Sequence, residues 1–250
     1  MRAKLPLALA LGVLLLSPLA ATAQDDQPSM IRAMYYWCDQ SKEARADEIV
    51  EQTIGPVYDQ LLASGDISAW GWLIHTHGGK WRRVAYWAAE SQDALLDATE
   101  KLIAALPEDD MEDFNAICPG HDDYIWWSIG GSSGTEIPSD RAEAGLSTYY
   151  QCDMNTEADA DELMLETFGP VLDNHVKAGG FNSWTWLGHA WGGKVRRLLA
   201  FDGADHKSIL NTHAAAFAEI GNANPAALEK FVEICPVHED YLWNIAQSKP

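Results

Sequence analysis

The sequence predicts an α+β protein made of two consecutive βαββαβ repeats, and three observations support this fold class. The same motifs occur twice at a constant offset, because Tyr35–Asp39 returns as Tyr149–Asp153 and Trp70–Arg83 returns as Trp184–Arg197. Strand and helix patterns follow one another in the same order in both copies. Each copy also holds one pair of cysteines at equivalent positions. A repeat of this length is a domain and not a solenoid unit.

The first strand and first helix of the repeat are predicted from aromatic content and helical periodicity. The strand covers residues 33–37 and ends at Cys38. A helix begins near residue 42, with Ile49, Thr53 and Val57 on one face. Gly55–Pro56 is expected to break or kink this helix, because the residue before a proline avoids helical geometry.

A β-hairpin, a second helix and a last strand complete the repeat. Residues 69–76 and 81–87 read as strands on either side of His77–Lys80, a glycine-containing turn typical of hairpins. Ser91 is expected to cap the second helix, which buries Leu95, Leu102 and Leu106. The last strand is predicted over residues 124–129, and the same six elements fit residues 148–245.

Right-handed connections in this order produce a four-stranded antiparallel sheet with the spatial order 4-1-3-2 and both helices on one face. The first and last strands are then neighbours, which places Cys38 beside Cys118 and Cys152 beside Cys235. Four cysteines allow three pairings. The equivalent positions in the two repeats favour disulfides within each repeat.

The N-terminal residues are typical of a secretory signal peptide. Arg2 and Lys4 precede an apolar run over residues 5–16 and small residues at 21–23, so cleavage is expected before Gln24. The apolar run is shorter than the roughly 20 residues that span a bilayer. We therefore expect a periplasmic or secreted protein, in which disulfides persist.

The predicted domain boundaries follow from the repeat and from a Gly–Ser run between its copies. A short helix-compatible stretch at residues 139–146 follows that run. The segments are a signal peptide (1–23), an N-terminal extension (24–32), the first repeat (33–129), a linker (130–147) and the second repeat (148–250).

The formal net charge of −20 opposes binding to nucleic acid or to anionic membranes. The sequence does not determine the oligomeric state, but a monomer suffices if the two repeats pair within one chain.

The element order and the paired hairpins resemble the dimeric α/β-barrel superfamily of ferredoxin-like domains, here in a fused form. A single sheet would leave an aromatic face bare, and two copies can bury these faces against each other. The superfamily includes cofactor-independent monooxygenases, haem-degrading enzymes, isomerases, polyketide cyclases and proteins without known activity. The resemblance implies a pocket between sheet and helices, but no catalytic motif can be carried over.

His75 and His189 are the predicted catalytic residues. Each stands near the end of a strand beside a glycine hairpin, with Arg82 or Arg196 following across the turn. Such an imidazole can act as a general base, and the arginine can stabilise the anion produced. Alternatively, the imidazoles only hydrogen-bond to a neighbouring strand or to the hairpin.

The predicted ligand-binding residues are cationic or aromatic side chains present in both repeats. Arginines can bind an anionic group, and aromatic rings can line an apolar pocket. The alternative is that the arginines neutralise acids of this protein and the rings fill its core. The residues are Arg82, Arg196, Trp72, Trp186, Tyr36 and Tyr150.

Two patterns could bind metal. His75 and His77 project to the same side of a strand, but the second repeat has Trp191 at the position of His77. The second pattern, His121–Asp123, returns as His238–Asp240 and could also be an acid–base pair or a strand start without a ligand.

The sequence therefore favours an exported α/β-barrel protein that holds a small apolar or aromatic molecule. In an enzymatic version, histidine acts as general base without a cofactor, and none is predicted. The alternatives are a metal- or haem-binding protein and a non-catalytic structural or binding module.

Overall fold

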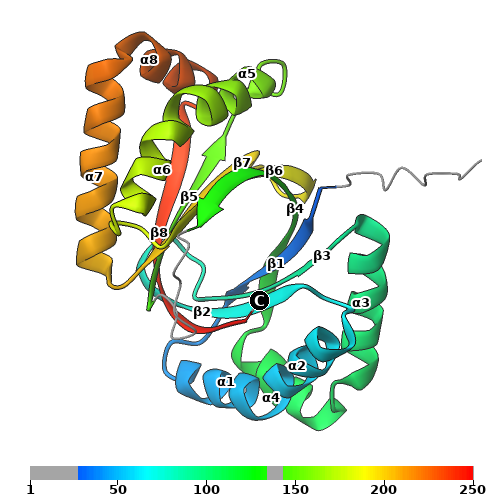
Figure 1. Ribbon diagram of the computed structural model, residues 1–250. Helices are drawn as coiled ribbons and strands as arrows, with labels where there is room; N and C mark the ends of the chain where they lie inside the picture. The colour runs from blue at the N-terminus through cyan, green and yellow to red at the C-terminus, as the bar shows by residue number, and fades with distance from the viewer. Residues whose placement is uncertain (1–27, 134–142, 250) are drawn as a thin grey trace, which may run out of the picture.

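The computed structural model describes residues 28–133 and 143–249. The predicted signal peptide and the middle of the predicted linker lie outside the described residues. Within the described ranges, eight antiparallel strands form one closed barrel with helices on its outside (Figure 1).

The elements of the two repeats correspond one to one. The first repeat contains β1 (Met30–Trp37), α1 (Glu43–Ile49), a π-helical segment (Val50–Ile54), α2 (Gly55–Ser64), β2 (Ala69–Gly78), β3 (Arg83–Ala89), α3 (Gln92–Ala105), α4 (Glu108–Ile117) and β4 (Gly120–Ser133). The second contains β5 (Ala144–Gln151), α5 (Glu157–Glu162), a π-helical segment (Leu163–Phe168), α6 (Gly169–Lys177), β6 (Ser183–Gly192), β7 (Arg197–Gly203), α7 (His206–Ala223), α8 (Pro225–Ile234) and β8 (Val237–Lys249).

The predicted spatial order 4-1-3-2 is confirmed in both repeats, as β4-β1-β3-β2 and as β8-β5-β7-β6. The two sheets join edge to edge, because β2 pairs with β8 and β4 pairs with β6. The faces opposite the helices thus become the inside of one barrel. The helices of the first repeat and those of the second cover opposite sides of it (Figure 1). The predicted fold class, a pseudo-dimeric α/β barrel in one chain, is confirmed.

The strands around the chain midpoint are longer than the sequence pattern predicts. Residues 130–133, expected in a linker, belong to β4, where Ser132 pairs with Trp184 of β6. Residues 144–146, expected to favour a helix, begin β5 and pair with β7 and β8. Strand pairing overrides the local preference of these residues, across the seam between the repeats for 130–133 and within the second repeat for 144–146.

The helix does not break at Gly55–Pro56. It passes through the π-helical segment Val50–Ile54 and continues as α2. In the widened π-helical turn the Gly55 N–H donates to the Val50 carbonyl oxygen, so the helix continues although Pro56 has no N–H to donate. A Cβ at Gly55 would lie 3.0 Å from the carbonyl oxygen of Val50 and 3.1 Å from Trp70, so glycine suits this close approach.

Each repeat also contains a helix that the sequence analysis did not predict, α4 in the first and α8 in the second. The predicted cap of α3 is confirmed, because the Ser91 side chain accepts a hydrogen bond from the Ala94 N–H. Leu95 and Leu102 are buried as expected.

Strand alternation divides the apolar side chains into three cores. On β2, Trp70 and Trp72 face the helices of the first repeat, whereas Leu73 faces the barrel interior with Tyr35 and Trp126. A separate cluster lies under the helices of the second repeat.

Both predicted disulfides are confirmed, Cys38 with Cys118 and Cys152 with Cys235. They indicate an oxidising compartment. Among the described helices, none is both long enough and apolar enough to span a membrane.

Candidate functional site

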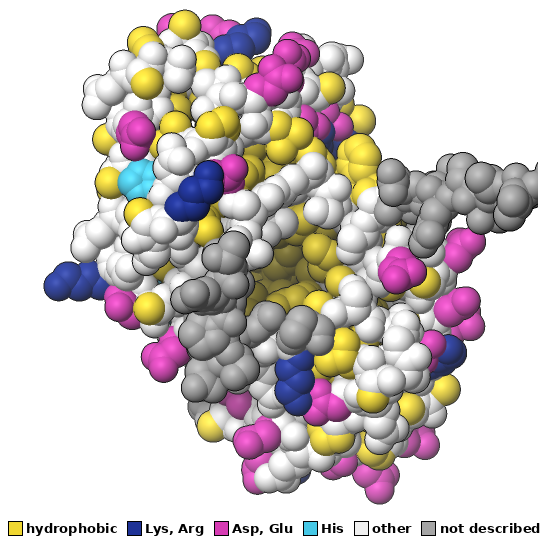
Figure 2. Space-filling view, in the orientation of Figure 1, with side chains coloured by type: hydrophobic (Ala, Val, Ile, Leu, Met, Phe, Trp, Pro, Cys, Tyr) yellow, Lys and Arg dark blue, Asp and Glu magenta, His cyan; other side chains and the backbone are white. Residues whose placement is uncertain are grey.

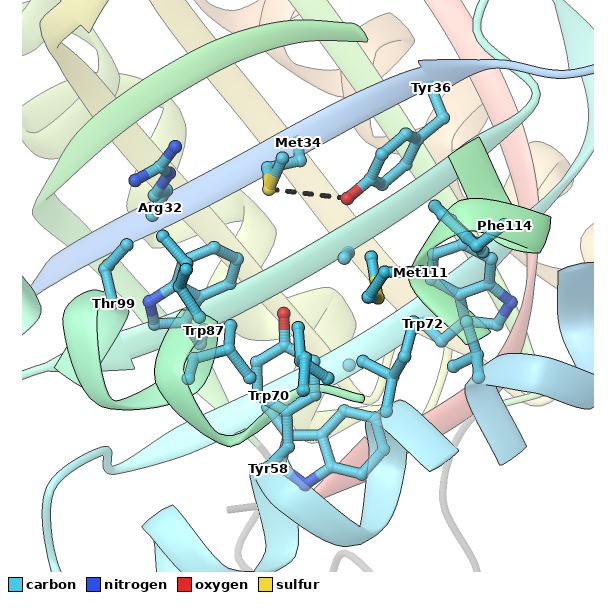
Figure 3. Close-up of a pocket in the computed structure, with 17 residues that line it drawn as sticks. Arg32, Met34, Tyr36, Tyr58, Trp70, Trp72, Trp87, Thr99, Met111 and Phe114 are labelled. Carbon is cyan, nitrogen blue, oxygen red and sulfur yellow. Dashed lines mark hydrogen bonds between the residues drawn. The ribbon is translucent and has the colours of Figure 1, made fainter. Parts of the chain in front are cut away.

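A cavity of about 140 Å³ lies in the first repeat between its sheet and helices α2, α3 and α4 (Figure 3). We call it the helix-side cavity. A dry cavity of about 150 Å³ is large enough for benzene in an engineered protein. The volume therefore corresponds to one aromatic ring.

The walls of the helix-side cavity are mainly aromatic and are held in place by hydrogen bonds. Tyr58 of α2 stacks on Trp70 with ring centroids 5.0 Å apart. The Trp70 indole donates to Asp59 at 3.0 Å, and the Trp72 indole donates to Asp47 at 2.9 Å. The rings thus form a preformed apolar surface of the kind that binds small molecules.

Two tyrosine hydroxyls lie in this apolar setting. The Tyr58 hydroxyl points into the cavity, and no described residue is its hydrogen-bond partner (Figure 3). The Tyr36 hydroxyl donates to the Met34 sulfur at 3.4 Å, and a thioether is a weak acceptor. Burial raises the pKa of both tyrosines well above the ordinary value of 10.0, so each stays a neutral hydrogen-bond donor.

Arg32 of β1 supplies the positive charge at the helix-side cavity. Its guanidinium lies 5.4 Å from the ring centroid of Trp87 and 3.7 Å from the carboxylate of Asp123. The Trp87 indole N–H is buried without a partner among the described residues. The cavity therefore combines the guanidinium of a long side chain with neutral hydrogen-bond donors on an apolar wall.

The second repeat has filled the equivalent space. At corresponding positions, larger or apolar side chains replace the groups that shape the cavity, and Phe168 and Leu199 are fully buried in its core. The pairs are Arg32 and Leu146, Ile54 and Phe168, Ala85 and Leu199, and Ile103 and Phe217. These differences make the helix-side cavity a feature of the first repeat.

The imidazole of His75 is engaged on both sides. Its Nδ1 lies 2.6 Å from Nη1 of Arg82, and its Nε2 lies 3.4 Å from the carbonyl oxygen of Gly78. Arg82 in turn donates to Glu43 at 2.6 Å. An Nδ1 that accepts from a guanidinium and an Nε2–H that donates to a carbonyl define a neutral, occupied imidazole.

His189 repeats this arrangement with Arg196, at 2.7 Å, and with the carbonyl oxygen of Gly192, at 3.2 Å. Neither histidine is among the residues that line the helix-side cavity or the cavity inside the barrel. The catalytic role of both histidines stays a prediction, and it requires the imidazole to leave its arginine.

The other predicted ligand-binding residues are divided between the cavity and the packing of the fold. Trp72 and Tyr36 line the helix-side cavity. Trp186 and Tyr150 pack in the filled core of the second repeat, where their ring centroids are 5.9 Å apart. Arg82 and Arg196 form ion pairs with Glu43 and Glu157.

The histidine pair predicts how stability depends on pH. Burial, together with the charge of Arg82, lowers the pKa of His75 below 6.5, and burial likewise lowers that of His189. The unfolded chain then binds more protons in this range, so stability is full above 6.5 and falls as the pH decreases through the lowered values. The urea concentration at the midpoint of unfolding should therefore decrease as the pH is lowered from 8 to 5, a range that brackets the ordinary histidine pKa.

Replacing both histidines with glutamine should reduce the slope of that profile, since glutamine does not titrate; His213, whose pKa is also lowered by burial, keeps part of it. The carboxylates act at lower pH, because the hydrogen bond from Arg196 lowers the pKa of Glu157 below 4.5. An unchanged slope in the double variant would contradict the assignment.

The described residues do not favour a metal site. No group of three or more potential ligands converges in residues 28–133 and 143–249. His77 is exposed, and the pairing of β2 with β8 shifts register between His75 and His77. His121 and His238 instead pair with Asp123 and Asp240, at 3.0 Å and 3.2 Å.

Haem is too large for the helix-side cavity. Its four-pyrrole macrocycle exceeds a cavity that holds one aromatic ring. No histidine or cysteine lies among the described residues that line either cavity, although methionine and tyrosine, which can also ligate haem iron, do line them.

Tyr58 and Arg32 are site residues that were not predicted from the sequence. The predicted site residues are kept in both repeats, whereas these two positions hold Leu172 and Leu146 in the second. Positions where one copy departs from the other were the available signal.

Comparison with solved structures settles the architecture. An anthrone oxidase-like protein superposes with a TM-score of 0.59 over 90% of this chain and 94% of its own, at 11% identity. The fold is that of a dimeric α/β barrel. A candidate monooxygenase from Fusobacterium nucleatum gives a TM-score of 0.60 over 89% of this chain and 94% of its own, at 10% identity.

A mutant chlorite dismutase from Candidatus Nitrospira defluvii shares this α/β-barrel fold, with a TM-score of 0.54 over 88% of this chain and 92% of its own, at 11% identity. No protein-family model matches the sequence. No curated protein matches it significantly. At sequence identities of 10–11%, these similarities establish the fold alone.

Proposed function

We propose that this α/β-barrel protein binds a single-ring aromatic molecule carrying an acidic oxygen, such as a phenol, in the helix-side cavity. The observation that carries the proposal is the Tyr58 hydroxyl, which has no partner among the described residues and points into an apolar cavity the size of one ring. The hydroxyl opens onto the cavity, and a ligand oxygen placed there can accept its hydrogen bond.

The surrounding groups suit the same ligand. The rings of Trp70 and Trp87 offer stacking or edge contacts. Arg32 can stabilise negative charge on the ligand oxygen, which favours its ionised form. The names of two structural neighbours, an anthrone oxidase-like protein and a candidate monooxygenase, are compatible with an aromatic ligand.

An enzymatic version needs a base beside the bound ring. His75 does not line the helix-side cavity and its ring lies against Tyr241 and Trp243, so it would have to leave both these rings and Arg82 to supply that base. If His75 is that base, His75→Gln abolishes turnover of the bound phenol while the affinity for phenol stays unchanged.

Phenol binding can be followed at the indole N–H signals of the ¹⁵N-labelled protein. Phenol should shift the signals of Trp70 and Trp87, which line the helix-side cavity. Tyr58→Phe should weaken phenol about tenfold, the effect of one hydrogen bond, and leave benzene unchanged. Equal losses for phenol and benzene would show that the hydroxyl does not contact the ligand.

The second repeat supplies the variants that fill the cavity. Ala85→Leu and Ile54→Phe introduce the residues found at the matching positions, Leu199 and Phe168. The combined variant should lose the phenol-induced shifts of Trp70 and Trp87. Overpacking costs about 1–3 kcal/mol in general, so thermal unfolding must confirm that the variant is folded. Undiminished shifts in a folded variant would refute the proposal.

A further inference from the structure

The interior of the barrel holds a second cavity of about 270 Å³, which we call the barrel cavity. It is visible as a hollow lined by hydrophobic side chains (Figure 2). Alternate residues of β1 separate the two cavities, because Ile31 and Ala33 line the barrel cavity while Arg32 and Met34 line the helix-side cavity. Both repeats contribute to the barrel cavity, so it is a site distinct from the one proposed above.

An aromatic cluster packs at one end of the barrel. Trp81 stacks on Tyr241 with ring centroids 5.0 Å apart, and it contacts Tyr35 at 4.4 Å and Tyr149 at 5.0 Å. Tyr35 and Tyr149 also line the barrel cavity. The cluster therefore forms its floor.

The two repeats contribute unequally to the walls. Several polar lining residues stand where the other repeat has alanine. These pairs are Ser147 and Ala33, Tyr86 and Ala200, and Asp202 and Ala88. A symmetric packing core would not need such differences, whereas an asymmetric ligand would.

One indole N–H beside this cavity lacks a partner. Trp126 donates to the Tyr35 hydroxyl at 3.2 Å. Its counterpart Trp243 is fully buried and lines the cavity, yet its N–H has no partner among the described residues. The hydroxyl of Tyr149, the counterpart of Tyr35, does not accept from it.

We infer that the barrel cavity binds a neutral two-ring aromatic molecule that carries one acceptor oxygen. The volume is about twice that of the helix-side cavity. No lysine, arginine or histidine is among the described lining residues, and the net charge of −20 opposes an anion. The oxygen supplies the acceptor for Trp243, whose buried N–H becomes accessible when the side chains over it move aside, and the rings cover the apolar walls.

Titration with 2-naphthol tests this inference, again through the indole signals. The signals of Trp126 and Trp243 should shift, and those of Trp70 and Trp72 should not, because naphthol exceeds the helix-side cavity. Trp243→Phe should weaken 2-naphthol about tenfold and leave naphthalene unchanged. Equal effects on both compounds would overturn the role of the N–H.

The sequence offers a variant that closes the barrel cavity. In the first repeat, Tyr86 lies against Gly71, where a Cβ would come within 2.3 Å of its ring. The matching pair in the second repeat is Ala200 and Thr185. Thr185→Gly with Ala200→Tyr copies the first arrangement and places a second phenol ring in the cavity.

This double variant should bind 2-naphthol at least tenfold more weakly while its phenol-induced shifts at Trp70 remain. Thermal unfolding shows independently that the variant is folded. Undiminished naphthol affinity, or no shift of Trp126 and Trp243 in the unmodified protein, overturns the inference. If naphthol binds and phenol does not, the barrel site stands and the proposed function fails.

Discussion

Replacing Arg83 with methionine is expected to lower the free energy of unfolding by about 3–5 kcal/mol, the usual cost of removing one partner of a buried ion pair. The side chain of Arg83 is 4% exposed and binds Asp47 through two hydrogen bonds of 2.6 Å and 2.7 Å. Its loss leaves the Asp47 carboxylate and that of Glu43 without this cation. Asp47 also holds the Trp72 indole, so the wall of the helix-side cavity loosens as well. Urea denaturation and thermal unfolding measure the effect, which corresponds to about 10 °C in a domain of this size.

Two matched variants serve as controls for the loss of unfolding free energy expected from Arg83→Met. Arg197→Met removes the equivalent cation from Asp161 in the second repeat and should cost about the same. Arg45 pairs with Glu48 and Asp113 at the surface, so Arg45→Met should cost about 0–1 kcal/mol. The interpretation fails if Arg83→Met is as mild as Arg45→Met.

Removal of the first disulfide by Cys38→Ser with Cys118→Ser should cost about 4 kcal/mol. The crosslink joins residues 80 positions apart and restricts the unfolded chain over that whole loop. The second crosslink spans 83 positions, so its removal should cost a similar amount. Chemical denaturation of each double-serine variant, without reductant, measures both.

Reductant provides the control for the disulfide prediction. Dithiothreitol should destabilise the unmodified protein by more than either double-serine variant loses, since it opens both loops. Peptide mapping without reduction should recover the two crosslinks within the repeats. A cost below about 1 kcal/mol would mean that the closed loop is already restricted in the unfolded chain.

The topology was predictable because several levels of the sequence agree on it. Hairpin turns, apolar periodicity and the places of Cys38 and Cys118 all lead to the same strand order. The closure of the barrel through the pairs β2–β8 and β4–β6 was harder to predict from the sequence. Residues 130–133 read as a linker until the partner strand β6 is present, since Gly and Ser carry little strand preference of their own.

The location of the site was not predictable from conserved pairs. His75 and Arg82 look like a base and its anion-binding partner in sequence, but in three dimensions they hydrogen-bond to each other. The helix-side cavity depends on side-chain volume instead. Ala85 and Leu199 are both apolar, so the hydrophobic pattern does not distinguish them. Only the packing around them shows that the first repeat contains the cavity.

Closure of the barrel within one polypeptide has a consequence for how its two halves can vary. In a barrel assembled from two identical subunits, every substitution appears in both sheets, so a residue that opens a pocket on one side opens it on the other. Here Ile54 can remain small while Phe168 fills the matching space, and neither change compromises the other half. Fusion thus allows one half to specialise in recognition while the other serves as a rigid support.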